Sequence, residues 1–487
     1  MNEPRQHMVS QHGTHAPSMT HAPHVAHAPY GSHAPYGPHA PYGSHAPYGS
    51  HTPHAPAAPR MAPPNPPARE LARPFLPDMP LFNLLLIGSV AALLMLSHLM
   101  LGWLGVRYDV PGGNILEKIH PGTWLALITF ALALFTSADP YRQLGRVLGR
   151  HGGALFFAGA WLVLLFHAVV NLRMPFTPLV DSFLLPVVLL FLLDDLDERR
   201  TRLLRRLIHG FMAVNALLGI FEVASGWRLT PFIIGELNQS DDWRATALLG
   251  HPLNNAGTTA IYLLMLALRP AGLAPLPRLL FFALNLAAMP AFGGRVAMVL
   301  LLLMLAVIGG YRLMQVFAGR RLSHAQAALA LFLAPAAVLL VVAALDAGLL
   351  DKFLLRFVDD KGSAEARLIM LELFRHVPDQ ELIWGPDAAR IGALMRQQGL
   401  VGLESFWIAM ILSYGVFASV LFFIGLLAFL YDLWRTVGNA MLAIIIFFLL
   451  EASTSVSLSA KTTSFGLLVL FALTLLRQPG ASSRSTY

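Results

Sequence analysis

The chain contains no cysteine in its 487 residues, and its share of charged residues is low. The absence of cysteine excludes disulfides, thiolate nucleophiles and cysteine-based metal sites. Charged residues make up 13% of the sequence, whereas a soluble protein contains about 25%. So little charge, combined with 56% hydrophobic residues, argues against a soluble globular protein and favours a membrane protein.

The apolar residues are gathered in long runs that short basic segments separate. This pattern predicts an all-α, polytopic integral membrane protein with about twelve transmembrane helices. The predicted spans lie near residues 81–105, 123–138, 153–171, 179–194, 207–227, 256–270, 279–293, 296–311, 327–347, 405–430, 439–456 and 463–477. We therefore expect a membrane domain over residues 79–477, followed by a short cytoplasmic tail at 478–487.

The first 78 residues differ from the rest, because they are dominated by His, Ala, Pro, Tyr and Gly. From His27 to His51 a six-residue unit of the type HAPYGS repeats. Proline in every unit prevents a continuous helix, and the unit has too little apolar mass for a core. Residues 1–78 are therefore predicted to form a disordered cytoplasmic tail. Loose binding of divalent metal ions by the repeated histidines is an alternative role for it.

The distribution of arginine predicts the orientation of the membrane domain. Arginines gather in the approach to the first span and in the loops after spans two, four and eight, so every second loop is basic. Because basic loops stay in the cytoplasm, both termini are predicted to be cytoplasmic. Two longer loops, near 228–255 and 348–404, then lie on the opposite side. Chemistry or recognition is expected there, since functional residues concentrate on loops.

Five polar residues next to spans are the candidate functional residues. Arg244 and His251 precede the sixth span, Arg295 lies between spans seven and eight, Arg367 lies in the second long loop, and Glu404 precedes span ten. By the orientation argument all five lie at one membrane level. Guanidinium groups bind phosphate oxygens bidentately and keep their charge when partly desolvated, so three arginines there predict a diphosphate site.

Simpler interpretations exist for each of these residues. An arginine can mark the membrane interface or pair with a neighbouring acid, and Arg244 closely follows Asp241 and Asp242. A histidine before a proline at a helix start, as in His251, is often a hydrogen-bonded structural residue. The asparagines at 254 and 255 are candidate helix caps.

The segment SAEARLIMLELF, which contains Arg367, predicts an amphipathic helix. Leu368, Leu371 and Phe374 recur there at helical spacing and are expected to form its apolar face. Motifs for nucleotide hydrolysis or zinc binding are missing from the predicted membrane domain. No metal ion or other cofactor is therefore expected, and the basic loops give no reason to expect nucleic-acid binding.

These segments together resemble the superfamily of O-antigen ligases and Wzy-type O-antigen and exopolysaccharide polymerases, over about residues 80–477. RATALLGHPLNNAGTTAIYLLML is similar to that family's arginine and turn before a span, which matches Arg244. GGRVAMVLLLL is similar to its arginine before a span of small and apolar residues, which matches Arg295. ARLIMLELFRHVPDQELIWGPD is similar to its loop helix with an arginine and a following glycine turn, which matches Arg367 and Gly385.

The resemblance implies a glycosyltransferase in the bacterial inner membrane. Such an enzyme joins undecaprenyl-diphosphate-linked glycan repeat units at the periplasmic face, next to membrane lipid, and a chain-length regulator is a candidate partner. The three arginines would bind the diphosphate or glycan. Ligases of the family have a histidine where the large loop enters the next span, but this chain has Glu404 and Ser405. The departure favours a polymerase over a ligase, with Glu404 as the first candidate for the general base and His251 as the second.

A transporter or flippase for a lipid-linked or anionic substrate is the main alternative from another class. It would also have many spans and outer arginines, but it predicts polar residues at mid-membrane depth and two similar halves. The sequence has few charges within its spans, and only its second half has the larger loop. An enzyme that transfers glycan is therefore the favoured prediction.

Overall fold

The computed structural model describes residues 75–110, 112–234, 237–238, 241–319, 351, 355, 363–400, 402–454, 458 and 460–477. Almost all of the predicted N-terminal tail, the ninth predicted span and the C-terminal tail lie outside these residues. The described part is helical apart from one small hairpin, in which β1 (Ile233–Ile234) pairs antiparallel with β2 (Leu237–Asn238). Within the described residues, the expected all-α fold class is confirmed.

The first part of the described chain is a series of helices joined by short connections. They are α1 (Pro80–Met95), α2 (His98–Trp103), the 3-10 helix η1 (Ile115–Lys118), α3 (Pro121–Phe135), α4 (Pro140–Arg150), α5 (Gly152–Phe166), the π-helix η2 (His167–Asn171), α6 (Thr177–Leu179), the π-helix η3 (Val180–Leu184), α7 (Leu185–Leu193) and α8 (Glu198–Ser225).

The second part begins after the hairpin. Its helices are α9 (Pro252–Leu268), α10 (Pro275–Phe292), α11 (Arg295–Phe317), α14 (Ser363–Glu372), the 3-10 helix η4 (Leu373–His376), α15 (Asp379–Trp384), α16 (Ala388–Gln397), α17 (Phe406–Val437), α18 (Ala440–Ala452), α19 (Ser464–Phe471) and the π-helix η5 (Ala472–Leu476).

Several of these helices have the length and composition that a membrane span needs. Within the described residues, five could cross a membrane on this basis: Gly152–Asn171, Glu198–Ser225, Pro275–Phe292, Arg295–Phe317 and Phe406–Val437. Five shorter apolar helices coincide with further predicted spans: Pro80–Met95, Pro121–Phe135, Thr177–Leu193, Ala440–Ala452 and Ser464–Leu476. These helices fit the predicted membrane protein.

The surface of α11 illustrates this fit. Val299, Leu303 and Val307 are half or more exposed, whereas Ala297 and Leu301 on the opposite side of the helix are buried. A wide apolar surface of this kind is costly in water and favourable in lipid.

Small residues allow the long helices to pack closely. A Cβ atom on Gly153 of α5 would lie 2.2 Å from the carbonyl oxygen of Ala428 on α17. A Cβ atom on Gly425 of α17 would lie 2.9 Å from Cβ of Ala160 on α5. Such close backbone approach is typical of helix pairs in membranes, where dispersion forces rather than water exclusion drive association.

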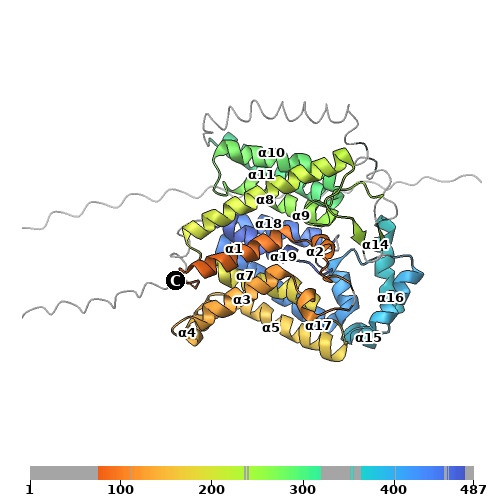
Figure 1. The fold of residues 1–487 in the computed structure, drawn as a ribbon. Helices are drawn as coiled ribbons and strands as arrows, with labels where there is room; N and C mark the ends of the chain where they lie inside the picture. Colours follow the sequence, from red (N-terminus) through yellow and green to blue (C-terminus); the bar gives the residue numbers. More distant parts are fainter. Residues whose placement is uncertain are drawn as a thin grey trace, which may run out of the picture. The chain divides into compact units, whose positions relative to one another are not determined.

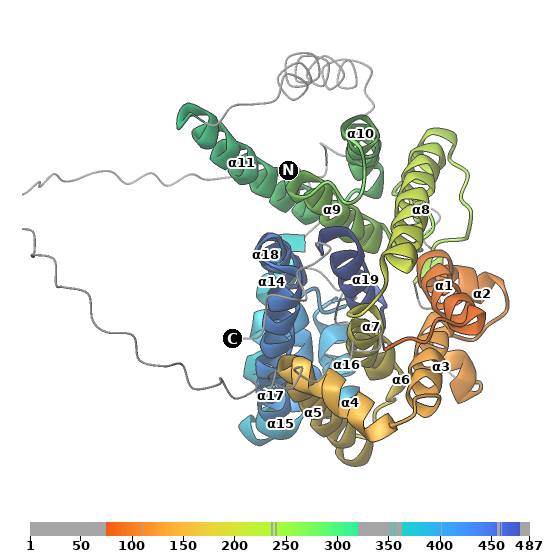
Figure 2. The same ribbon diagram turned by 90° about the vertical axis from the view of Figure 1, so that its left-hand side faces the viewer.

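The two ends of the long helices carry different elements. Figure 1 shows α14, α15 and α16 at one end, here named the loop end, and α4 at the other, here named the α4 end. Helix α15 meets α17 at a kink, because Gly415 has φ 82° and a Cβ atom there would lie 2.4 Å from the amide nitrogen of Gly385. In Figure 2, α9 lies beside α11 and α19, with which it is in contact.

The first predicted span, 81–105, is interrupted in the structure. Helix α1 ends at Met95, and the hydroxyl of Ser97 then caps α2 by accepting a hydrogen bond from the amide of Met100 at 3.3 Å. A serine at a helix start satisfies an amide that would otherwise have no partner. The break brings the residue after Ser97, His98, to the loop end instead of burying it in a continuous span.

Of the three apolar residues predicted to share one face of the Arg367 helix, only Phe374 packs against the rest of the protein. The helix exists as α14, but Leu368 and Leu371 are 70% and 56% exposed. Met370 and Leu373 are instead buried, in a small cluster with Ile391 of α16. Both sets have helical spacing, and contact with α16 and α17 decides between them, which the sequence pattern alone does not reveal.

Candidate functional site

The loop before α9 is held by a buried acid on α8. Both carboxyl oxygens of Glu222, which is only 3% exposed, accept hydrogen bonds from backbone amides. The donors are Leu229 at 3.2 Å, Thr246 at 2.9 Å and Ala247 at 3.0 Å. Because buried amides need partners, Glu222 fixes the path of the chain on both sides of the hairpin. The sequence analysis did not single out this residue.

Two buried asparagines complete the support of the same loop. The side-chain oxygen of Asn215 on α8 accepts from the amide of Leu248 at 3.0 Å. The side-chain nitrogen of Asn255 donates to the carbonyl oxygens of Thr246 at 2.6 Å and of His251 at 3.1 Å. Asn255 was a predicted cap of α9. The capping residue is in fact His251, and Asn255 ties the first turn of the helix back to the loop.

Arg244 pairs with Asp242 in the same loop. Its Nε lies 3.0 and 2.9 Å from the two carboxyl oxygens, and its Nη2 also contacts this carboxyl group. Nη1 has no hydrogen-bond partner among the residues that the structure describes. The local acid pair that the sequence suggested is therefore present, and it also orients the arginine.

Arg244 lies against the turn that leads to Arg295. A Cβ atom on Gly293 would lie 2.7 Å from both Cγ and Cδ of Arg244, and the amide of Ala245 donates to the carbonyl of Ala291 at 2.9 Å. Arg295 is the first residue of α11, two positions after Gly293. Two of the three predicted arginines, 51 positions apart in the sequence, are thus brought together at the loop end.

A further arginine lies beside this pair. Nη2 of Arg228 donates to the carbonyl oxygen of Arg244 at 3.3 Å, and its guanidinium lies 5.6 Å from the ring centroid of Phe232. The ring of Phe232 lies in turn 5.8 Å from that of His251. Arg228 was not predicted from the sequence. Its position three residues after the end of α8, at the start of the first long loop, was the available signal.

His251 is buried at the start of α9 and is uncharged at neutral pH. Its Nδ1 accepts a hydrogen bond from the amide of Leu253 at 3.2 Å. Burial lowers the pKa of His251 to about 3, and the neighbouring His98 and Arg244 act in the same direction, against Asp242. Because Nδ1 is an acceptor, the single proton of the neutral ring must lie on Nε2. In this tautomer the Nε2 group of His251 donates a hydrogen bond and does not take a proton.

Glu404 lies next to the helix that contains Arg367. The backbone amide of Glu404 donates to the sulfur of Met370 at 3.1 Å, and Met370 is three positions after Arg367 on α14. The side chain of Arg367 lies outside the described part of the structure. Glu404 itself is half-buried, at the entrance to α17. The structure thus places Glu404 beside α14, as a second group at the loop end.

The end of α18 connects the two groups. Nε1 of Trp407, on the first turn of α17, donates to the hydroxyl of Ser453 at 2.7 Å. Glu451, two residues earlier, is buried against α9, where a Cβ atom on Gly257 would lie 2.7 Å from its Oε1. The starts of α17 and α9 therefore contact the same short segment.

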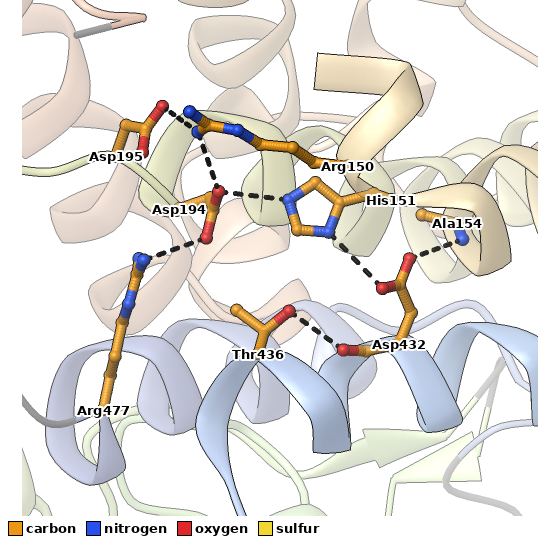
Figure 3. A network of polar contacts seen from close by, with 8 residues as sticks. All are labelled: Arg150, His151, Ala154, Asp194, Asp195, Asp432, Thr436 and Arg477. Atoms are coloured by element: carbon orange, nitrogen blue, oxygen red, sulfur yellow. Dashed lines mark hydrogen bonds and ion pairs between the residues drawn. The ribbon is translucent and has the colours of Figure 1, made fainter. Parts of the chain in front are cut away.

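A different polar network lies at the α4 end and was not expected from the sequence. His151 is placed between two acids, with Nε2 3.2 Å from Asp194 and Nδ1 3.6 Å from Asp432 (Figure 3). Arg477 pairs with Asp194 at 3.1 Å, and Arg150 lies 3.6 Å from the same carboxylate. Burial alone would lower the pKa of His151, but the two aspartates outweigh it and raise the pKa to about 9. This network joins α4, α7, α17 and η5.

No protein-family model matches the chain, and no curated protein matches it. The assignment of function therefore rests on the chemistry of the loop end.

Proposed function

We propose that the protein is a metal-independent membrane glycosyltransferase that joins undecaprenyl-diphosphate-linked glycan repeat units. In this proposal it has about twelve spans and both termini in the cytoplasm, and it acts at the periplasmic face of a bacterial inner membrane. The observation that carries the proposal is the packing of Arg244 against the Gly293 turn, two residues before Arg295.

The arrangement suits a diphosphate at the depth of lipid headgroups. Asp242 holds the Nε edge of Arg244, so the guanidinium would be oriented before the substrate arrives. Arg295 begins a helix whose apolar surface is suited to lipid. A lipid-linked diphosphate has the same two parts, an anionic head and an apolar tail, and it would contact both features together.

In the proposed reaction a hydroxyl of the acceptor glycan attacks the anomeric carbon of the donor. A new carbon–oxygen bond forms, the bond from that carbon to the diphosphate breaks, and its electron pair leaves with undecaprenyl diphosphate. Arg244 and Arg295 neutralise the charge that develops on the departing group, which is commonly the largest electrostatic contribution to catalysis. Arg367 is proposed to contact the same diphosphate or the glycan, and the loop helices cover this end.

The acceptor proton needs a base, for which Glu404 and His251 were the predictions from sequence, and the proton on Nε2 of His251 leaves Glu404 as the candidate of the two. Nε2 of His251 carries the ring proton in the observed arrangement and is suited to donate a hydrogen bond to the diphosphate or a sugar oxygen. Glu404 is at the entrance to α17, next to α14.

Substitution of Arg244 and Arg295 tests the proposal. Each alanine variant would be expressed in a strain deleted for the native gene, with polymer length read on a gel and lipid-linked single repeat units measured by mass spectrometry. We expect each variant to lower the rate of polymerisation by about 100-fold, as the loss of one transition-state donor does. Arg390→Ala is the matched control, because this arginine is 45% exposed and pairs with Glu381 on α15.

The products separate the possible functions. Accumulation of single repeat units indicates a polymerase, and long chains that fail to reach their lipid acceptor indicate a ligase. Repeat units retained on the cytoplasmic side indicate a flippase and contradict the proposal. Normal polymer from both arginine variants, at normal protein level, would also contradict it.

A further inference from the structure

A small polar cavity at the loop end is lined by His98 and His120. Its volume is about 40 Å³, and its polar lining includes Ser97, His98, Tyr108, Asn254, Thr258 and Lys461. Since a water molecule needs about 10–15 Å³ of such space, the cavity has room for a hydroxyl group and one or two waters, but not for a sugar ring. Polar groups from α2, α9 and the segment before α19 therefore converge on a space of hydroxyl size.

Two histidines, His98 and His120, line this cavity, and His251 lies in the sequence between the lining residues Leu249 and Asn254. The hydrogen bonds of His120 and His251 are already assigned. His120 accepts from the amide of Gly122 at Nδ1, at 3.1 Å, and its Nε2 donates to the carbonyl of Leu96 at 2.6 Å. Nδ1 of His251 accepts from Leu253, so its Nε2 carries the proton. His98 differs from both, because its ring has no hydrogen-bond partner among the described residues. A neutral His98 thus has one ring nitrogen free to accept a proton.

His98 is also close to the diphosphate arginines. A Cβ atom on Gly250 would lie 3.5 Å from Cε1 of His98, and His98 is near enough to His251 to act on its charge. The charge of Arg244 also acts on His251. The imidazole of His98 therefore lies against Gly250, the residue before His251, and His251 interacts electrostatically with Arg244.

The charged neighbours of His98 are Asp109 and Lys461. The ammonium of Lys461 donates to the carbonyl of Tyr108 at 2.7 Å and lies 3.3 Å from the centroid of its ring. Burial lowers the pKa of Lys461 to about 8, against the effect of the nearby aspartates. Burial and the charge of Lys461 disfavour an imidazolium on His98, and Asp109 favours it. Lys461 also provides a donor to orient an oxygen in the cavity.

We propose that His98 is the general base and that this cavity receives the attacking hydroxyl of the acceptor glycan. The inference rests on the proposed glycosyltransferase function and names a catalytic residue for it. The free ring nitrogen of His98 takes the hydroxyl proton while the oxygen forms its bond to the anomeric carbon. The electron pair of the broken bond leaves with the diphosphate, and the imidazolium then returns its proton to water.

Chemical rescue tests the assignment. Purified wild-type protein, His98→Ala and His98→Gln would be added in detergent to lipid-linked repeat units extracted from the deletion strain, and polymer formed per minute would be measured. We expect both variants to be slower by about 100-fold, within the usual contribution of a general base. Added imidazole should raise the rate of His98→Ala by at least about tenfold, because this variant leaves space for it. His98→Gln fills this space, so imidazole should not restore its activity.

Controls separate a base from a structural residue. His376, on η4, is an exposed histidine whose Nδ1 lies 3.1 Å from the carbonyl of Glu372. The His376→Ala variant should therefore keep the wild-type rate with and without imidazole. Binding of undecaprenyl diphosphate, measured by quenching of tryptophan fluorescence, should be unchanged in both His98 variants. Loss of this binding would show that the variants have damaged the site, and that outcome would overturn the role as a base.

The outcomes distinguish this inference from the proposed function. If wild-type protein neither polymerises the repeat units nor binds undecaprenyl diphosphate, the function itself is wrong. If wild-type protein is active and His98→Gln retains more than about one third of its rate, only the assignment of His98 is wrong. Rescue of Glu404→Ala by formate, without rescue of His98→Ala by imidazole, would move the base to Glu404.

Discussion

Two buried histidines at opposite ends of the helices have opposite electrostatics. At the α4 end, His151 lies between Asp194 and Asp432, and its pKa is raised to about 9. At the loop end, His251 lies near His98 and Arg244, and its pKa is lowered to about 3. The first network pairs each buried charge and joins several helices. The second leaves Nε2 of His251 and Nη1 of Arg244 without a hydrogen-bond partner among the described residues, which fits the proposed binding site.

The largest effect is predicted for removal of one acid from the network of the α4 end. Asp432→Ala removes the acid that faces Nδ1 of His151 and accepts from the amide of Ala154 at 3.1 Å, and it leaves Asp194 as the only aspartate beside the imidazolium. Breaking a buried ion pair costs about 3–5 kcal/mol, so the thermal unfolding midpoint in detergent should fall by several degrees. Asp195→Ala is the control, since this carboxylate is partly exposed and such pairs contribute about 0–1 kcal/mol.

The comparison would fail if the two variants had equal midpoints. That result would mean that the His151 network adds no more than an exposed ion pair does. Binding of undecaprenyl diphosphate is a second readout, because Asp432→Ala protein that still folds should bind it as wild-type protein does.

The pH dependence of unfolding should have opposite signs at the two histidines. The folded pKa of His151, about 9, is above its unfolded value of about 6.5, so its contribution is complete below pH 6.5 and is lost as the pH rises to 9. This contribution is about 3 kcal/mol at most. The folded pKa of His251, about 3, is below the unfolded value. As the pH falls from 6.5 towards 3, the unfolded chain binds a proton that the folded protein does not bind, so the free energy of unfolding decreases.

Two substitutions check these signs. The difference in unfolding midpoint between wild type and His151→Gln should shrink between pH 6.5 and 9. The His251→Asn variant should be less sensitive than wild type to pH between 6.5 and 4. Parallel profiles for wild type and both variants would show that neither histidine is linked to folding.

The sequence predicted the helices better than their polar contacts. Long apolar runs predict spans because a segment that crosses the lipid must be apolar and must satisfy its own backbone hydrogen bonds. Five helices that are long and apolar enough occur within the described residues. Arg244 and Asp242 were predictable as a pair because they are neighbours in the chain. The contact of Arg244 with Gly293 depends on how α8, α9 and α10 pack, and a local pattern does not contain this information.

Glu222 and His98 show why other residues of the loop end were missed. Each lies in or beside a long apolar run, where a single polar residue has no visible partner in the sequence. The contacts of Glu222 form only when the loop before α9 folds back onto α8, and the position of His98 depends on the end of α1 and the Ser97 cap of α2. The packed side of α14 was not predictable for a related reason, since two overlapping periodic patterns were available and tertiary contact buried Met370 and Leu373.

The smallest effect is predicted for Glu222, which is held by backbone amides, in contrast to the cation-paired Asp432. In Glu222→Gln the side-chain oxygen can keep the bonds of Oε2 with Thr246 and Ala247, and the new amide nitrogen replaces Oε1 opposite Leu229. One lost acceptor costs about 1–3 kcal/mol, less than breaking the His151 network. Hydrogen exchange should therefore accelerate at Leu229 and stay slow at Thr246 and Ala247. Glu222→Ala should accelerate exchange at all three amides, and equal exchange in the two variants would show that the carboxyl group does not hold this loop.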